Sequence, residues 1–130
     1  MATLTPTLTL TGTAADFGAA LSLSATKALS TTSPAVGLSK IAATTTGANN
    51  IIQPNTDGQT YYVYVRHTGK DAGGSTVTST LNIELTGDTP FAKLAAEEFA
   101  FFPCGGHSTG VQLQASASTI VAEYAFFTKG

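Results

Sequence analysis

The chain has 130 residues, a formal net charge of −2 and 11% charged residues, less than half of the roughly 25% that is typical of globular domains. One domain of this length removes roughly two-thirds of its unfolded surface from water, which is enough for a core. The six basic residues are scattered singly, and this argues against nucleic-acid binding, which depends on clustered Lys and Arg.

A membrane-spanning helix is not expected, because no run of residues approaches the ~18–20 apolar positions that it needs. The N-terminal stretch MATLTPTLTL lacks the basic and continuously apolar parts of a signal peptide, so we expect synthesis in the cytosol. The single cysteine, Cys104, cannot form an internal disulfide, so packing and any assembly must supply the stability.

The first predicted element is an alternating stretch at the N-terminus. Residues 3–11 place Thr at every second position, and Pro6 marks the stretch as an edge strand or an arm. We therefore expect residues 1–12 to be an N-terminal arm or edge strand. The leucines between the threonines are Leu4, Leu8 and Leu10.

Two further strands are predicted in the first third of the chain. Residues 19–29 put Leu21 and Leu23 on one side of a strand, and a weaker strand follows around Val36 to Ile41. Residues 46–58 contain Gly, Asn, Pro and Asp-Gly, which is typical of a turn region.

The strongest predicted strand is TYYVYVRHT, residues 60–68, which is rich in aromatic and β-branched residues. The side chains that share one of its faces are those of Tyr61, Val63 and Val65. A loop leads to a second strand in residues 79–87, whose inward side chains are Leu81, Ile83 and Leu85. We predict that these two strands form a hairpin.

The last third of the chain continues the strand pattern. Residues 91–103 contain a segment, Ala95 to Glu98, that fits a helical turn, but the phenylalanines before Pro103 favour a strand. Residues 110–116 and 119–127 are predicted to form a hairpin. The pattern gives eight or nine short strands, so we expect an all-β fold: a single β-sandwich domain over residues 1–130, of jelly-roll or immunoglobulin-like type.

The final strand is apolar on both faces. One face carries Ile120, Ala122, Tyr124 and Phe126, and the other carries Val121, Ala125 and Phe127, interrupted only by Glu123. A strand that is apolar on both faces is covered on both faces. One face must belong to the core, and the other is covered either by a loop of the same chain or by another subunit.

Reactive side chains gather only in PCGGHSTG, residues 103–110. Cys104 and His107 are three residues apart, as two zinc ligands can be, but a structural zinc site needs four protein ligands and a catalytic one usually three. The only other histidine is His67, and nothing identifiable orients a base for a Cys–His nucleophile pair. We interpret the segment as a Gly-rich turn and expect no catalytic, cofactor-binding or metal-binding residues and no cofactor.

Other motifs give no sharper chemistry. The Gly-Lys of the loop GKDAGGS lacks the spacing of a phosphate-binding loop, so we expect a mobile loop tip. Glu97 and Glu98 are adjacent, so on a strand they point to opposite faces and cannot act as a pair. Tyr62 and Tyr64 form a potential stacking platform for a sugar, which leaves a carbohydrate-binding module as an alternative of another class.

The surface pattern favours assembly. Most outward strand positions carry Thr, Ser, Ala, Asn or Gln, whereas isolated β-domains protect their strand edges with charged residues. We therefore expect contact with copies of the same chain or with a larger surface. The expected interface residues are Leu4, Leu8 and Leu10 on the arm, and Val121, Ala125 and Phe127 on the last strand.

The order and style of several segments resemble one class of virion protein. These segments are MATLTPTLTLTGT, SPAVGLSKIAATTTGANNII, YYVYVRHTG, GDTPFAKLAAEEFAFFP and GVQLQASASTIVAEYAFFTKG. They are similar to the small virion structural proteins of tailed bacteriophages, particularly those of marine and cyanobacterial hosts. The resemblance implies a β-sandwich that coats the virion, often as an oligomeric cement or decoration protein that bridges major capsid subunits. It carries over no functional residues.

We therefore expect a non-enzymatic virion structural protein that is assembled in the host cytoplasm. The main expectation is a capsid decoration or cement protein that binds copies of itself, for example as a trimer, and the major capsid protein. A tail or head-fibre component is the alternative within the same class. Neither nucleic acid nor a membrane is an expected partner, and a glycan is the less favoured ligand.

Overall fold

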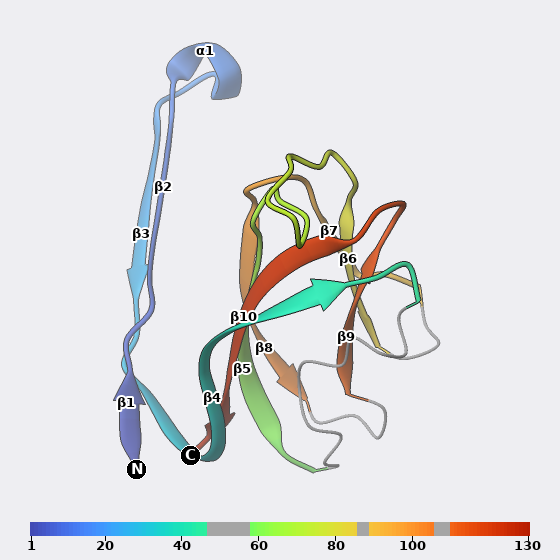
Figure 1. Cartoon of the computed structure of the whole chain (residues 1–130). Coiled ribbons are helices and arrows are strands. Elements are labelled where there is room, and N and C mark those ends of the chain that lie inside the picture. Colours follow the sequence, from blue (N-terminus) through green and yellow to red (C-terminus); the bar gives the residue numbers. More distant parts are fainter. Residues whose placement is uncertain (47–57, 86–88, 106–109) are drawn as a thin grey trace. The chain divides into compact units, whose positions relative to one another are not determined.

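A computed structural model describes residues 1–46, 58–85, 89–105 and 110–130 (Figure 1). These residues form ten strands and one helical turn, so the chain is all-β with several antiparallel sheets, as the period-two pattern predicts. They divide into two compact units, residues 1–32 with 129–130 and residues 33–128.

The first unit contains two antiparallel pairings. β1 (Ala2–Leu4) pairs with the first residues of β4 (Leu29–Ala43), which places Leu4 opposite Leu29. β2 (Thr7–Gly12) pairs along its whole length with β3 (Leu21–Thr26), and a single helical turn, α1 (Ala14–Phe17), lies between them in the sequence. We call the β2–β3 pair the ribbon.

The expected N-terminal arm, residues 1–12, contains β1 and β2 and lies within the first compact unit, which extends to residue 32. β3 pairs with β2 along its whole length, so this strand belongs to the same unit as the expected arm. A single β-sandwich domain over residues 1–130 stays a prediction.

The second unit contains two sheets (Figure 1). One has the order β4, β10 (Ile120–Lys129), β5 (Thr60–His67), β8 (Phe99–Gly105), and the other has the order β7 (Ala92–Leu94), β6 (Leu81–Leu85), β9 (Val111–Ala115). Both sheets contribute to one hydrophobic core. Side chains that are fully buried include Tyr61, Val63, Val65, Leu81, Ile83, Leu113 and Ile120.

The predicted inward faces of the two central strands are confirmed by this core. Tyr61, Val63 and Val65 are all at 0% exposure, and so are Leu81 and Ile83. Burial of these side chains removes their apolar surface from water, which is the main driving force for the two sheets to pack. Whether the sandwich is of jelly-roll or immunoglobulin-like type stays a prediction.

Both predicted hairpins are wrong. β5 pairs with β10 and β8, and β6 pairs with β7 and β9, so the chain crosses from one sheet to the other between β5 and β6. The same holds for β9 and β10, which lie in different sheets. Two consecutive strands can either pair as a hairpin or lie in different sheets. Here they lie in different sheets, and both contribute side chains to the shared core.

The loop after β5, for which a mobile tip is expected, contains hydrogen bonds of its own. Asp71 Oδ1 accepts from the backbone N–H groups of Gly73 and Ser75, at 2.9 and 2.8 Å. Lys70 and Thr76 form a β-bridge, and the Lys70 ammonium donates to Thr76 Oγ1 at 2.9 Å. The aspartate therefore organises the turn in the manner of an Asx turn.

Candidate interaction surfaces

The ribbon has one apolar face and one hydroxyl face. Residues directly opposite each other in an antiparallel pair lie on the same side, and the register places Leu10 opposite Leu23 and Gly12 opposite Leu21. The apolar side, here called the leucine face, consists of Leu8, Leu10, Gly12, Leu21, Leu23 and Ala25. The other side, the hydroxyl face, consists of Thr7, Thr9, Thr11, Ser22, Ser24 and Thr26.

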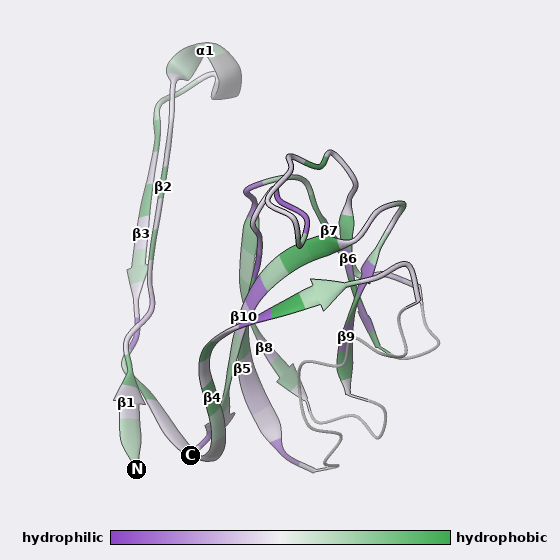
Figure 2. Ribbon diagram, in the orientation of Figure 1, coloured by the Kyte–Doolittle hydropathy of each residue, from purple (hydrophilic) through white to green (hydrophobic). Residues whose placement is uncertain are grey.

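Among the described residues of its own unit, none forms a layer over the leucine face. The four leucines are 39–46% exposed, and Figure 2 shows hydrophobic residues alternating with near-neutral ones along β2 and β3. A two-stranded sheet alone is marginally stable at best in water, because it needs a further layer or further strands to bury its apolar side. The ribbon alone therefore lacks the further layer that its apolar side needs.

The hydrogen-bond pattern of the ribbon shows which backbone groups are free. The N–H of Lys27 donates to the carbonyl oxygen of Pro6 at 3.3 Å, so these two opposite residues form a hydrogen-bonded pair. Because hydrogen-bonded and non-hydrogen-bonded pairs alternate, the leucine-face residues bond across the ribbon. The N–H and C=O groups of the hydroxyl-face residues then point outward along the two free edges. The contact of Thr7 Oγ1 with Thr26 Oγ1, at 3.0 Å, agrees with the close approach of a non-hydrogen-bonded pair.

Neither ribbon edge carries the usual protection against pairing. Natural edge strands are protected by Lys, other charges, Pro or bulges. β2 and β3 contain only Thr, Leu, Gly, Ser and Ala, and in the described residues no third strand pairs with either of them. Both edges of the ribbon can therefore accept another strand.

A second apolar surface lies on the larger sheet of the sandwich. The register of β8, β5 and β10 places five aromatic side chains on the face opposite the core: Tyr62, Tyr64, Phe99, Phe101 and Phe127. Phe99 is 64% exposed and Phe101 is 39% exposed, whereas Tyr62 is only 7% exposed and stacks on Phe101 with ring centroids 6.3 Å apart. We call this the aromatic face.

The free edge of β8 is protected, in contrast to the ribbon. The backbone carbonyl of His67 accepts a hydrogen bond from the N–H of Glu97, and the backbone N–H of His67 donates to the carbonyl of Glu98. Glu97 and Glu98 therefore both lie opposite His67, which is a β-bulge. Continuing the alternation from this bulge, Pro103 belongs to the residues whose backbone groups face away from β5. The missing N–H of Pro103 therefore interrupts the outer edge, as is usual for proline in an edge strand.

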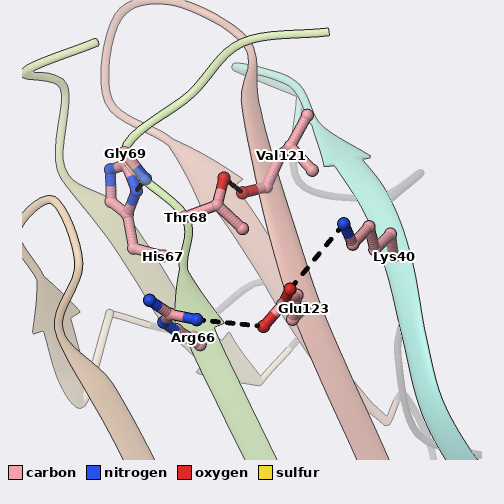
Figure 3. Close-up of polar contacts among 7 residues, drawn as sticks. All are labelled: Lys40, Arg66, His67, Thr68, Gly69, Val121 and Glu123. Carbon is pink, nitrogen blue, oxygen red and sulfur yellow. Dashed lines mark hydrogen bonds and ion pairs between the residues drawn. The ribbon is translucent and has the colours of Figure 1, made fainter. Parts of the chain in front are cut away.

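Glu123, the carboxylate in the last strand, is paired within the chain (Figure 3). The Glu123 carboxylate lies 3.5 Å from the Arg66 guanidinium on β5 and 3.8 Å from the Lys40 ammonium on β4. Arg66 and Lys40 are 43% and 66% exposed, so each ion pair contributes on the order of 0–1 kcal/mol. The pairing explains how a carboxylate is accommodated in an otherwise apolar strand.

The six expected interface residues are found in different environments. Leu8 and Leu10 are exposed on the leucine face, and Leu4 is half-buried opposite Leu29. Val121 and Phe127 are half-buried, and Ala125 is buried at 5% exposure between its neighbours in the sheet. The outer face of the last strand therefore offers a partner less surface than the sequence suggested, because β10 is an interior strand with β4 and β5 on its two sides.

Exposed apolar residues on β3 and β8 are not among the interface residues expected from the sequence. Leu21 and Leu23 complete the leucine face, and Phe99 and Phe101 expose the aromatic face. The leucines carried a usable signal, since their strand alternates Leu with Ser, has no charge and follows a strand of the same kind. The phenylalanines carried none, because their exposure depends on which strands surround them.

The candidate reactive residues that the structure describes are not gathered into a reactive site. Cys104 lies on the core-facing side of β8 opposite Tyr61, and burial raises the pKa of its thiol. His107 lies outside the described residues. Among the residues that are described, no group of three or more His, Cys, Asp or Glu side chains could hold a metal ion. The same residues contain no helix with the length and hydrophobicity of a membrane span.

His67 has a structural role. Its ring is fully buried, its Nδ1 accepts from the backbone N–H of Gly69 at 2.9 Å (Figure 3), and its Nε2 lies 2.9 Å from the carbonyl oxygen of Ser79. Nε2 therefore carries the proton and donates to that carbonyl. The ring joins the two ends of the crossing between the sheets.

Comparison with protein-family models, curated proteins and solved structures finds no match to this chain.

Proposed function

We propose that this protein is a non-enzymatic structural component of a phage virion, namely a capsid decoration or cement protein that works through contacts with copies of itself and with major capsid subunits. The observation that supports the proposal best is the leucine face of the ribbon, which is uncovered and free of charge. Contiguous exposed apolar patches mark interaction sites, so a surface of this kind supports binding to another protein.

The proposed mechanism is mechanical. The sandwich is the body of the protein, and the ribbon adds apolar surface and unpaired backbone groups that bind neighbouring subunits. Each contact adds a few kcal/mol at most, but the contacts repeat over many sites of a shell. Expansion or rupture of the shell then has to break many of them, which makes opening slow.

The carbohydrate-binding alternative gains no support from Tyr62, one of the two tyrosines on which it depends. A sugar stacks on an accessible ring face, and Tyr62 is 7% exposed with its ring against Phe101. A tail or head-fibre component remains the alternative within the virion class, and the binding experiment below separates the two.

The test uses purified protein and heads that were assembled without it, from the phage whose genome encodes the chain. We expect the protein to bind the heads at a fixed stoichiometry and to raise the temperature at which they release their contents. The double variant Leu10→Ser, Leu23→Ser should bind at least tenfold more weakly. The matched variant Thr9→Ser, Ser24→Thr, which alters only the hydroxyl face, should bind like the wild type.

Heads that leave the wild-type protein unbound would contradict a decoration role. If the protein then bound purified tails of the same phage, the tail alternative would replace it. Retention of full head binding by the Leu10→Ser, Leu23→Ser variant would show that the leucine face is not the contact.

A further inference from the structure

We propose that two copies of the chain join through the outer edges of their β2 strands, antiparallel and related by a two-fold axis that passes beside Thr9. The two ribbons then form one four-stranded intermolecular sheet with a continuous leucine face. This inference deepens the proposed function, since it names the first partner of the arm as a second copy and specifies the backbone groups that join them.

The geometry of the β2 edge is self-complementary. Its free N–H and C=O groups belong to Thr7, Thr9 and Thr11, at equal spacing along the strand. A two-fold axis beside Thr9 places this residue opposite its own copy and Thr7 opposite Thr11 of the second copy. Each of these pairs can exchange two hydrogen bonds, so every free donor finds an acceptor.

The same register aligns the side chains. It places Leu8 of one copy opposite Leu10 of the other, on the same side of the new sheet. A shift by one residue would oppose leucines to threonines and is therefore disfavoured. Pairing through the edges leaves the joined leucine face, now twice as large, available for the next layer.

The charge pattern favours a second copy as the partner and β2 as the edge. No charged side chain occurs from Ala2 to Ala15, so two β2 strands meet without repulsion and without burying a charge. The outer edge of β3 is less suitable, because Lys27 follows it directly and would lie beside the apolar Leu21 of the second copy. The edge of β8 is also less suitable, because Pro103 lacks the N–H that an added strand would need.

Proline substitutions test which edge pairs. Proline lacks the N–H but is tolerated where this group points out of a sheet, so Thr9→Pro removes an intermolecular donor and leaves the β2–β3 hydrogen bonds intact. Ser24→Pro makes the same change on the opposite edge of the ribbon. We expect the wild-type full-length protein to form dimers or higher even-numbered oligomers in light-scattering and sedimentation measurements. Thr9→Pro should weaken their dissociation constant at least tenfold, and Ser24→Pro should change it less than twofold.

Disulfide formation tests the register independently. In a Cys104→Ser background, Thr9→Cys brings two cysteines into a pair with Cα atoms about 5.5 Å apart, which is within the range of a disulfide. Thr7→Cys places them roughly 13 Å apart, four residues along the strand. We expect mild oxidation to give a covalent dimer with Thr9→Cys and little with Thr7→Cys or Ser24→Cys.

A wild-type monomer at high concentration, a trimer, or equal effects of Thr9→Pro and Ser24→Pro would overturn the pairing of β2 with itself. Efficient cross-linking through Ser24→Cys instead of Thr9→Cys would also overturn it. Head binding is measured separately, so the two proposals can fail independently. A monomer that still binds heads would refute the pairing and support the proposed function. A β2-linked dimer that binds neither heads nor tails would support the pairing and refute the proposed function.

Discussion

The ring of Phe126 meets the ring of Tyr61 edge to face in the sandwich core, with the ring centroids 6.0 Å apart and the planes at 81°. The two residues come from neighbouring strands of the larger sheet, and both are buried, Tyr61 completely and Phe126 at 6% exposure. This contact fixes the C-terminal strand to the strand with the strongest sequence signal.

Phe126→Ala should lower the free energy of unfolding by about 3–5 kcal/mol, because it removes a buried ring and leaves a cavity against Tyr61. Urea denaturation followed by near-ultraviolet circular dichroism measures the change. Phe127→Ala is the matched control, because its side chain is half-buried on the opposite face, and it should cost less than half as much. Equal losses would mean that both faces of β10 are covered to the same degree.

Glu97→Gly should stabilise the protein by about 0.5–1 kcal/mol. Glu97 has φ of 71°, a conformation that costs an L-residue other than Gly roughly 1–2 kcal/mol, part of which the greater unfolded-state entropy of Gly offsets. It occupies the third position of a turn closed by the 3.1 Å bond from the Glu98 N–H to the Ala95 carbonyl, where glycine is preferred.

The control for this prediction is the neighbouring residue. Glu98 accepts from the Ala95 N–H through Oε2 at 2.8 Å, so Glu98→Gly should destabilise the protein. A β-branched residue tolerates positive φ poorly, so Glu97→Val should also lower the melting temperature. A Glu97→Gly variant that melts below the wild type would show that the carboxylate contributes more than the backbone conformation costs.

His67→Ala should lower the free energy of unfolding by about 2–4 kcal/mol. The substitution leaves a cavity at a fully buried position, and the Gly69 N–H and the Ser79 carbonyl lose their hydrogen-bond partner. His67→Asn should cost less, since its amide oxygen lies in the chain position of Nδ1 and can accept from Gly69. Thermal unfolding of the two variants gives the order. The reverse order would mean that the volume of the ring matters more than its hydrogen bonds.

Cys104 should react slowly with thiol reagents at neutral pH. Burial raises the pKa of its thiol, so the reactive thiolate is scarcer near pH 8 than for a cysteine of ordinary pKa. The rate of reaction with a disulfide reagent should therefore continue to rise at pH values where a free cysteine has levelled off. Reaction in denaturant, where the burial is lost, is the control, and equal rates in both conditions would contradict the assignment.

The inward faces of the central strands could be predicted from the sequence, and the partners of the strands could not. The alternation of Tyr61, Val63 and Val65 identifies a buried face whatever the neighbouring strand is. Whether β5 is followed by a hairpin depends on contacts far away in the sequence, such as the pairing of Tyr124 with Val65. The alternation of residues within one strand does not show which other strand it pairs with.

The ribbon shows the same limit in another form. Leu21 and Leu23 alternate with serine just as core residues do, but they lie in a strand that pairs only with β2 among the described strands, and their side chains remain 39% and 44% exposed. Exposure of an apolar face depends on how many layers the fold provides, and this is a property of the whole chain. The composition of these strands supports only the expectation of assembly, because an edge strand without charged residues is unusual in an isolated β-domain.

An attraction between uncharged strands cannot be screened by dissolved ions. Because β2 and β3 carry no ionisable side chain, association through the ribbon should hold equally well in dilute buffer and in concentrated sodium chloride. Sulfate, which is excluded from protein surfaces, should tighten it. The proposed dimer would therefore remain associated through changes of salt concentration that dissociate assemblies held by opposite charges.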